Sequence, residues 1–162
     1  MRRLGLILAT AVCTFVALGA VASAQTTLPF NGSYTEQFGG KQLSRPCPGD
    51  AFACGKGTIE GLGSFTTEIA GGGDETLTRT LTFSDGSTLV LEESFSSFTT
   101  PGRSSDSHAG EQSFGHPFTG VFDFTITGGT GRFAGATGSG TDTLSAAGNV
   151  GHGELTGSIT IP

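Results

Sequence analysis

Three charged residues interrupt alternating apolar patterns in this sequence: Glu36, Arg79 and Glu93. Each shares its alternate positions with Phe or Leu, so its side chain would point toward an apolar core. Because a lone buried charge is costly, such residues are usually paired or solvated. One hypothesis is an ion pair that closes one end of the fold. The other is a polar patch in an apolar cavity, where Glu36 or Glu93 would act as a base with a raised pKa and Arg79 would hold an anionic head group.

Six large apolar residues occupy the same alternating faces and would line such a cavity together with Arg79. They are Phe65, Leu81, Phe83, Leu91, Phe122 and Phe124. A second interpretation is that these side chains simply fill the interior, as they do in many small barrels. An open cavity with two carboxylates would favour catalysis, whereas a packed interior would exclude it.

Other motifs of catalysis or cofactor binding have little support in the sequence. His108, His116 and His152 lack the short spacing of metal ligands, so we expect solvated histidines and no metal. The glycine-rich segment Gly128–Gly131 is followed by neither a Lys-Ser/Thr pair nor a helix, which argues against a phosphate loop. There is no Gly-x-Ser-x-Gly motif of a serine hydrolase. We therefore expect no cofactor.

Period-two alternation predicts the strands that position these residues. The clear runs are 30–38, 59–69, 76–83, 89–95, 118–126 and 155–161, and a weaker run is 140–146. These are seven strands, and an eighth could lie in the poorly patterned segments. The segments 39–56 and 99–117 are predicted to be irregular loops.

The third and fourth runs meet at Ser84-Asp85-Gly86, a typical hairpin signal. A two-residue loop would pair Phe83 with Thr88. A three-residue loop with a glycine bulge would instead pair Leu81 with Leu89 and Arg79 with Leu91. We favour the second register because it gathers apolar residues on one face and places Arg79 diagonal to Glu93.

Antiparallel strands without helices must protect their edges, and closure into a barrel does this. We therefore predict an all-β fold, a closed antiparallel β-barrel of about eight strands, with a β-sandwich as the alternative. The chain has 28 Gly and only 14% charged residues, which fits neither a helical nor a disordered protein. Because it has one Tyr and no Trp, it lacks the aromatic girdles of an outer-membrane barrel.

The segment 123–138, with the sequence DFTITGGTGRFAGATG, resembles the strand–turn–strand signature of the allene oxide cyclase and dirigent barrels. The hairpin at 85–87, followed by Leu89, Leu91 and Phe95, is similar to the middle of that fold. The resemblance implies an eight-stranded antiparallel barrel whose glycine-rich turn lets Phe133 plug one end. It also implies an isomerase or cyclase acting on a lipid-like or phenolic substrate, although no motif here matches the polar catalytic residues of that family.

The N-terminus has the pattern of an export signal. Arg2 and Arg3 precede an apolar run at 4–21, and Ala22-Ser23-Ala24 supplies a cleavage site. We therefore predict a signal peptide at 1–24, with a transmembrane anchor as the competing interpretation, and a single domain at 25–162. The protein would be secreted into an extracellular or periplasmic space. There, Cys47 and Cys54 would form a disulfide, the alternative being a metal pair.

Charge and surface composition limit the partners. Without Arg2 and Arg3 the net charge of −6 becomes −8, which excludes nucleic acid and disfavours anionic membranes. The Thr, Ser and Glu of the outward faces favour a monomer, whereas the resemblance implies dimers or trimers. Our leading hypothesis is a secreted, non-enzymatic barrel that binds a small apolar ligand or serves as an extracellular interaction module. The alternative is an isomerase or cyclase that uses Glu36 or Glu93 inside the barrel.

Overall fold

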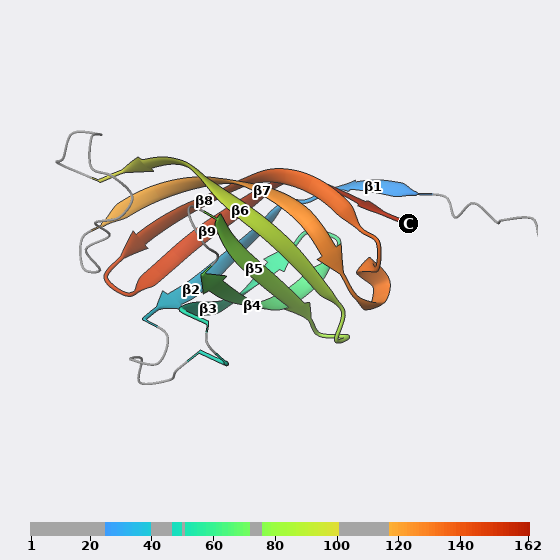
Figure 1. Cartoon of the computed structure of the whole chain (residues 1–162), viewed down its shortest axis with the longest axis horizontal. Coiled ribbons are helices and arrows are strands. Elements are labelled where there is room, and N and C mark those ends of the chain that lie inside the picture. The colour runs from blue at the N-terminus through green and yellow to red at the C-terminus, as the bar shows by residue number, and fades with distance from the viewer. Residues whose placement is uncertain (1–24, 40–46, 50, 72–75, 101–116) are drawn as a thin grey trace, which may run out of the picture.

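The alternation of hydroxyl-bearing and apolar residues becomes nine β-strands in the computed structural model, which describes residues 25–39, 47–49, 51–71, 76–100 and 117–162 (Figure 1). The strands are β1 (Thr26–Pro29), β2 (Gly32–Phe38), β3 (Ala53–Ile59), β4 (Gly63–Gly71), β5 (Thr76–Phe83), β6 (Thr88–Thr99), β7 (Phe118–Gly129), β8 (Thr137–Ala147) and β9 (Val150–Ile161). A 3-10 turn, Gly131–Phe133, joins β7 to β8. Within the described ranges there is no α-helix, and no helix long and apolar enough to cross a membrane.

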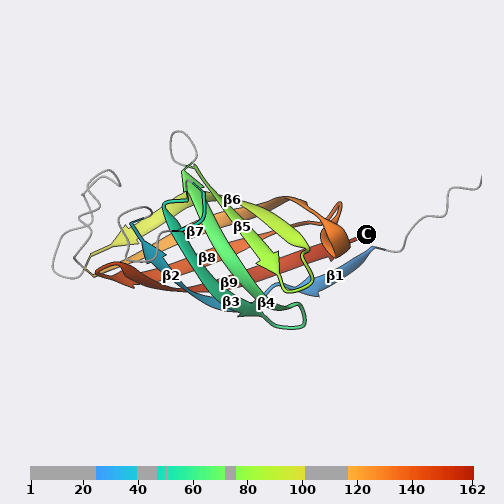
Figure 2. The same cartoon turned by 90° about the horizontal axis from the view of Figure 1, so that it is seen from below.

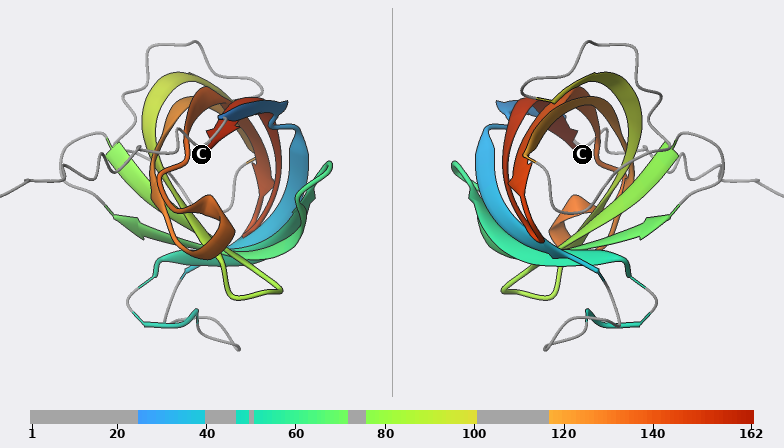
Figure 3. Two further views of the ribbon diagram at one scale, coloured as in Figure 1. Left: turned by 90° about the vertical axis from the view of Figure 1, so that its right-hand side faces the viewer. Right: turned by 90° about the vertical axis from the view of Figure 1, so that its left-hand side faces the viewer.

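Eight of these strands close into an antiparallel barrel, which confirms the predicted fold class. Strands β2 to β9 pair in sequence order, and β9 pairs with both β8 and β2, so the sheet returns on itself. Figure 3 shows this ring from its two ends, and Figure 2 shows β3 and β4 on the wall nearest the viewer. Strand β1 is an extra strand that pairs with the last residues of β9, from Ser158 to Ile161.

The hairpin between β5 and β6 has the register favoured by the apolar pattern. Leu81 pairs with Leu89 and Arg79 pairs with Leu91, while the amide of Gly86 donates to the carbonyl of Phe83. The prediction of a three-residue loop with a glycine bulge is therefore confirmed.

The prediction of one strand over 59–69 is wrong. The chain reverses after Ile59, and Gly61 (φ 74°) and Gly63 (φ 98°) adopt the left-handed backbone that this reversal requires. Strand β3 lies before the turn, and its first residues, 53–56, belong to the segment predicted to be an irregular loop. Its inward positions include Gly55 and Gly57, so alternation of side-chain type gives no signal there.

The inward faces form one apolar core of aromatic and branched side chains. Ring pairs pack across it, including Phe30 with Phe124 at 5.5 Å between centroids and Phe83 with Phe133 at 4.7 Å. Phe133 is fully buried, as the resemblance to the glycine-rich turn implied. The core therefore includes a ring supplied by the β7–β8 connection.

Cys47 and Cys54 form the predicted disulfide, with Sγ atoms 2.11 Å apart and Cα atoms 5.5 Å apart. A disulfide is compatible with an oxidising, non-cytoplasmic compartment. The predicted signal peptide at 1–24 lies outside the described residues.

Candidate functional site

A fully buried arginine organises the polar residues of the barrel interior. Arg79 on β5 places its Nε 2.5 Å from Glu93 Oε1 on β6 and its Nη1 2.8 Å from Glu36 Oε2 on β2. Its Nη2 lies 3.0 Å from Asp142 Oδ2 on β8. One guanidinium therefore joins carboxylates from three other strands, and the predicted contact between Arg79 and Glu93 is present.

Two neutral side chains complete this group. The hydroxyl of Tyr34 donates to Asp142 Oδ2 at 2.5 Å and accepts from Arg79 Nη2 at 2.9 Å. The Arg79 guanidinium carbon also lies 4.3 Å from the centroid of the Tyr34 ring, a cation–π contact. Thr67 Oγ1 lies 3.4 Å from Arg79 Nη1. We call Tyr34, Glu36, Thr67, Arg79, Glu93 and Asp142 the buried charge cluster.

Each member of the buried charge cluster occupies an inward position of its strand and is at most 4% exposed. The Tyr34 ring lies beneath Gly153 of β9, where an added Cβ would collide with ring carbon Cζ. Gly57 of β3 likewise leaves room, since a Cβ there would lie 2.6 Å from both Tyr34 Cβ and Phe65 Cζ. The absence of side chains at these glycines therefore makes room for Tyr34 inside the barrel.

The cluster contains three carboxyl groups but one guanidinium. Apart from a carboxyl–carboxyl contact between Glu93 and Asp142, one oxygen of each carboxyl has no hydrogen-bond partner: Glu36 Oε1, Glu93 Oε2 and Asp142 Oδ1. Burial raises the pKa of all three, although the charge of Arg79 opposes the shift, and the pKa of Glu93 rises to about 7. Burial also disfavours the charged form of Arg79, but the surrounding acids outweigh this and raise its pKa. The arginine therefore stays charged while the acids tend to retain protons.

The apolar residues predicted to line a cavity are at most 8% exposed and belong to the same packed core. Phe65 packs against Phe83 with ring centroids 5.9 Å apart, and Phe122 packs against Phe95 at 5.8 Å. Leu81 and Leu91 are fully buried, and Phe124 is 2% exposed. All six of these side chains therefore belong to the buried core.

Asp142 is the charged member of the cluster that was not predicted from the sequence. It shares alternate positions with Leu144 and Ala146 in the weak run 140–146, and this pattern is the same signal that indicated Glu36 and Glu93. Tyr34 and Thr67 carry no such signal, because either is ordinary on a strand.

The histidines give no metal site in the described part of the chain. His152 is exposed on the outer face of β9, whereas His108 and His116 lie outside the described residues. Among the residues described, no group of three His, Cys, Asp or Glu side chains is placed to hold a metal ion. Gly128–Gly131 forms the end of β7 and the start of the turn to β8.

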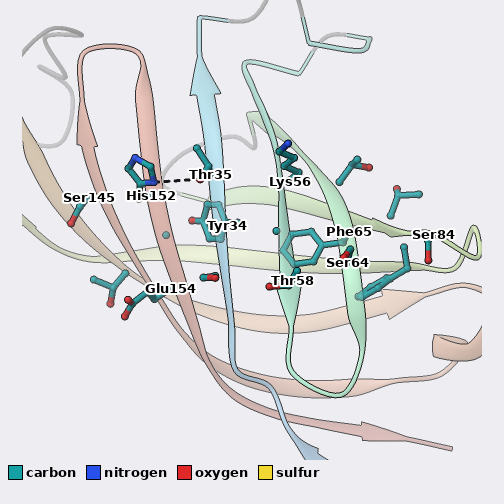
Figure 4. A pocket seen from close by; sticks show the side chains of 17 residues that line it. Tyr34, Thr35, Lys56, Thr58, Ser64, Phe65, Ser84, Ser145, His152 and Glu154 are labelled. Carbon is teal, nitrogen blue, oxygen red and sulfur yellow. Dashed lines mark hydrogen bonds between the residues drawn. The ribbon is translucent and has the colours of Figure 1, made fainter.

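A groove of about 970 Å³ lies on the outer wall of the barrel (Figure 4). Its exposed side chains form two rows across neighbouring strands, and the strand registers place the members of each row side by side. The first row is Thr143, Glu154, Ser33, Thr58 and Ser64. The second row is Ser145, His152, Thr35, Lys56, Thr66 and Thr82. We call this surface the outer groove.

The outer groove is polar and nearly balanced in charge. Most of its exposed side chains are Ser or Thr hydroxyls, which both donate and accept hydrogen bonds. Its charged side chains are Lys56 and Glu154, and His152 Nδ1 lies 3.3 Å from Thr35 Oγ1. Tyr34, Phe65 and Phe83 belong to the strands that form its floor, but these side chains are buried.

The chain matches no known family model, no curated protein and no solved structure. Two features of the structure are candidates for function, the buried charge cluster and the outer groove. The buried charge cluster could carry out acid–base chemistry only on a molecule that reaches the core, whereas the outer groove is open to solvent.

Proposed function

We propose that the protein is a secreted, non-enzymatic binding module, in which a filled β-barrel serves as a rigid scaffold and the outer groove meets the partner. The observation that carries this proposal is the contrast between the two faces of the same strands. The inward side chains pack into one core, while the outward side chains border a groove of about 970 Å³. Binding sites are usually concave, and the outer groove is a hollow in the barrel wall.

Export is part of the proposal. Residues 1–24 have the pattern of a signal peptide, in which two basic residues are followed by an apolar run and then by a cleavage site of small residues. The Cys47–Cys54 disulfide supports it, because such bonds persist in oxidising compartments. The glycine-rich strand–turn–strand segment of β7 and β8 supports kinship with the allene oxide cyclase and dirigent barrels. On this proposal the protein shares their barrel fold but uses its outer surface for a different function.

Native mass spectrometry tests whether the barrel interior is occupied by an extractable molecule. The protein is purified from its secretion medium and measured before and after organic extraction. We expect one mass, that of residues 25–162 less two hydrogens for the disulfide, unchanged by extraction. A small molecule that is retained and then lost on extraction would overturn the proposal.

The raised pKa of Glu93 favours a second candidate, an isomerase or cyclase acting on a lipid-like or phenolic substrate. Glu93 contacts both Arg79 and the Asp142 carboxyl, and a carboxyl with a pKa of about 7 suits general acid–base catalysis. Such a substrate would have to displace part of the aromatic core to reach this carboxyl. Incubation with an unsaturated fatty-acid epoxide, followed by chiral chromatography, tests this candidate. Enantioselective cyclisation that is lost in Glu93→Gln would favour it over the binding module.

A further inference from the structure

We infer that the outer groove binds a neutral, hydroxyl-rich chain, namely a linear polysaccharide lying across the strands. This inference rests on the proposed function and names its ligand class. It is carried by three properties of the groove: the direction of its rows, its charge balance and the character of its exposed side chains.

The rows run perpendicular to the strands and therefore offer a linear series of contacts. From β8 to β5 the second row crosses six strands, from Ser145 to Thr82. At a separation of about 4.8 Å between strands, this is a path of about 24 Å along the wall. Such a path suits an extended chain of several sugar units better than a compact metabolite.

The charges of the groove favour a neutral ligand. Lys56 of β3 and Glu154 of β9 have opposite charge, and β2 between them contributes Ser33 and Thr35. An anionic chain would be attracted to Lys56 but repelled by Glu154 and by a molecule whose net charge is −6. A neutral chain of hydroxyl groups meets neither penalty.

The exposed side chains argue against an apolar ligand or a protein partner. Protein interfaces concentrate aromatic, Met and Arg side chains at their centres and are depleted in Lys, Glu, Asp and Ser. In the outer groove the large apolar side chains are buried beneath the floor. Leu28 of β1, outside the groove, is the exposed large apolar residue among those described. Hydroxyl rows instead match the donors and acceptors of sugar hydroxyls.

His152 adds a directional contact. Its Nδ1 lies 3.3 Å from Thr35 Oγ1 in the same row, which fixes one side of the imidazole. In Figure 4 the ring stands above β9 beside Thr35, at the edge of the groove. Its other nitrogen has no protein partner among the described contacts and is available to a sugar hydroxyl.

Affinity gel electrophoresis tests the inference with soluble polymers cast into native gels. The probes are mixed-linkage β-glucan, glucomannan, linear mannan and amylose as neutral chains, and polygalacturonate as an anionic chain. We expect at least one neutral polymer to retard the protein and polygalacturonate not to do so. We also expect a hexasaccharide of the retarding polymer to bind more tightly than its disaccharide, since a longer chain reaches more of the row.

The variant Thr35→Val/Thr58→Val/Thr66→Val removes three groove hydroxyls with little change of shape. Loss of three hydrogen bonds should weaken binding roughly tenfold or more. The matched control is Thr125→Val, an exposed threonine on β7, which is outside the groove and should bind normally. Urea unfolding of both variants checks that each is folded.

The outcomes separate the two proposals. If no neutral polymer retards the protein while mass spectrometry finds an empty barrel, the polysaccharide inference is overturned and the binding module stands. If only polygalacturonate retards the protein, and the valine variant is no longer retarded, the inference of a neutral polysaccharide is also overturned and the binding module stands. Retardation that the folded valine variant retains would place the ligand elsewhere and overturn both proposals.

Discussion

The buried charge cluster supplies a cation, Arg79, to acidic side chains that are buried inside the barrel. Arg79 has five N–H donors, and acids on three other strands and Tyr34 accept from it. Such a group binds strands together only while each charge has its partner, because removal of one partner leaves the others buried and uncompensated. The cluster therefore links β2, β5, β6 and β8 and makes their register mutually dependent.

Arg79→Leu tests this dependence. We expect a loss of roughly 3–5 kcal/mol in the free energy of unfolding at pH 8, since three buried acids lose their cation. At pH 5 the loss of stability should be smaller, because protonated, neutral acids can remain buried without the charge of Arg79 nearby. Urea denaturation at both pH values measures the difference, and Arg79→Lys should lie between the parent and the leucine variant. Equal or greater stability in Arg79→Leu would show that the cluster does not hold the barrel together.

The inward charges are the part of the site that sequence predicts best. A charged residue inside an alternating apolar run is conspicuous, so Glu36, Arg79 and Glu93 are identified without coordinates. Asp142 gives a weaker signal because its strand alternates with glycine, and Tyr34 and Thr67 join the cluster only through folding. The outer groove escapes sequence analysis for a different reason. Its residues are ordinary outward Ser and Thr, and the order of the strands around the barrel determines which ones become neighbours.

At the scale of elements, inward glycines explain both the packing of aromatic rings against the strands and the failure to predict β3 as a strand. Inward positions of β3 and β9 are occupied by glycine opposite large rings, as Gly57 is beside Phe65 and Gly153 is above Tyr34. The strands are therefore close to the rings that fill the barrel. For the same reason β3 shows no apolar alternation, and periodicity assigns it to a loop. Strands with apolar inward faces, such as β7, are found correctly.

Gly153→Ala should destabilise the barrel because the new methyl group collides with the Tyr34 ring. We expect a loss of about 1–3 kcal/mol, typical of overpacking in a rigid core. The matched control is Gly71→Ala at the end of β4, where an added Cβ meets nothing within 4 Å. That change should have little effect or stabilise by up to about 1 kcal/mol. Chemical denaturation of both variants provides the comparison, and equal losses would contradict the close packing beneath Gly153.

At the scale of the whole molecule, the disulfide and the barrel make separate contributions to stability. Cys47 and Cys54 are seven residues apart, so the bond closes a short loop at the start of β3. The variant Cys47→Ser/Cys54→Ser should lose no more than about 2–3 kcal/mol and remain folded. Thermal unfolding with and without reductant measures this. If the serine variant failed to fold, the barrel core would be insufficient on its own.

The pH dependence of stability should be opposite to that of most proteins. Burial raises the pKa of Glu93 from 4.5 to about 7 and also raises those of Glu36 and Asp142, so the folded state binds more protons than the unfolded chain. The stability associated with Glu93 is therefore fully present below pH 4.5 and is lost as the pH rises through 7. For Glu93 alone the loss between pH 5 and pH 8 should be roughly 2–3 kcal/mol. Glu93 and Asp142 contact each other directly, and all three acids also interact with Arg79, so their titrations are coupled and the transition should be broad.

Urea unfolding measured at intervals from pH 5 to pH 8 tests this prediction. In Glu93→Gln the side chain remains neutral at every pH, so the decline should be visibly shallower than in the parent. Glu68→Gln, an exposed change on the outer face of β4, serves as the control and should leave the slope as it is. Stability that rises between pH 5 and pH 8 would show that Arg79 outweighs burial and holds all three carboxyls ionised. The described barrel would then carry a net negative charge at its centre, because one guanidinium cannot neutralise three ionised carboxylates.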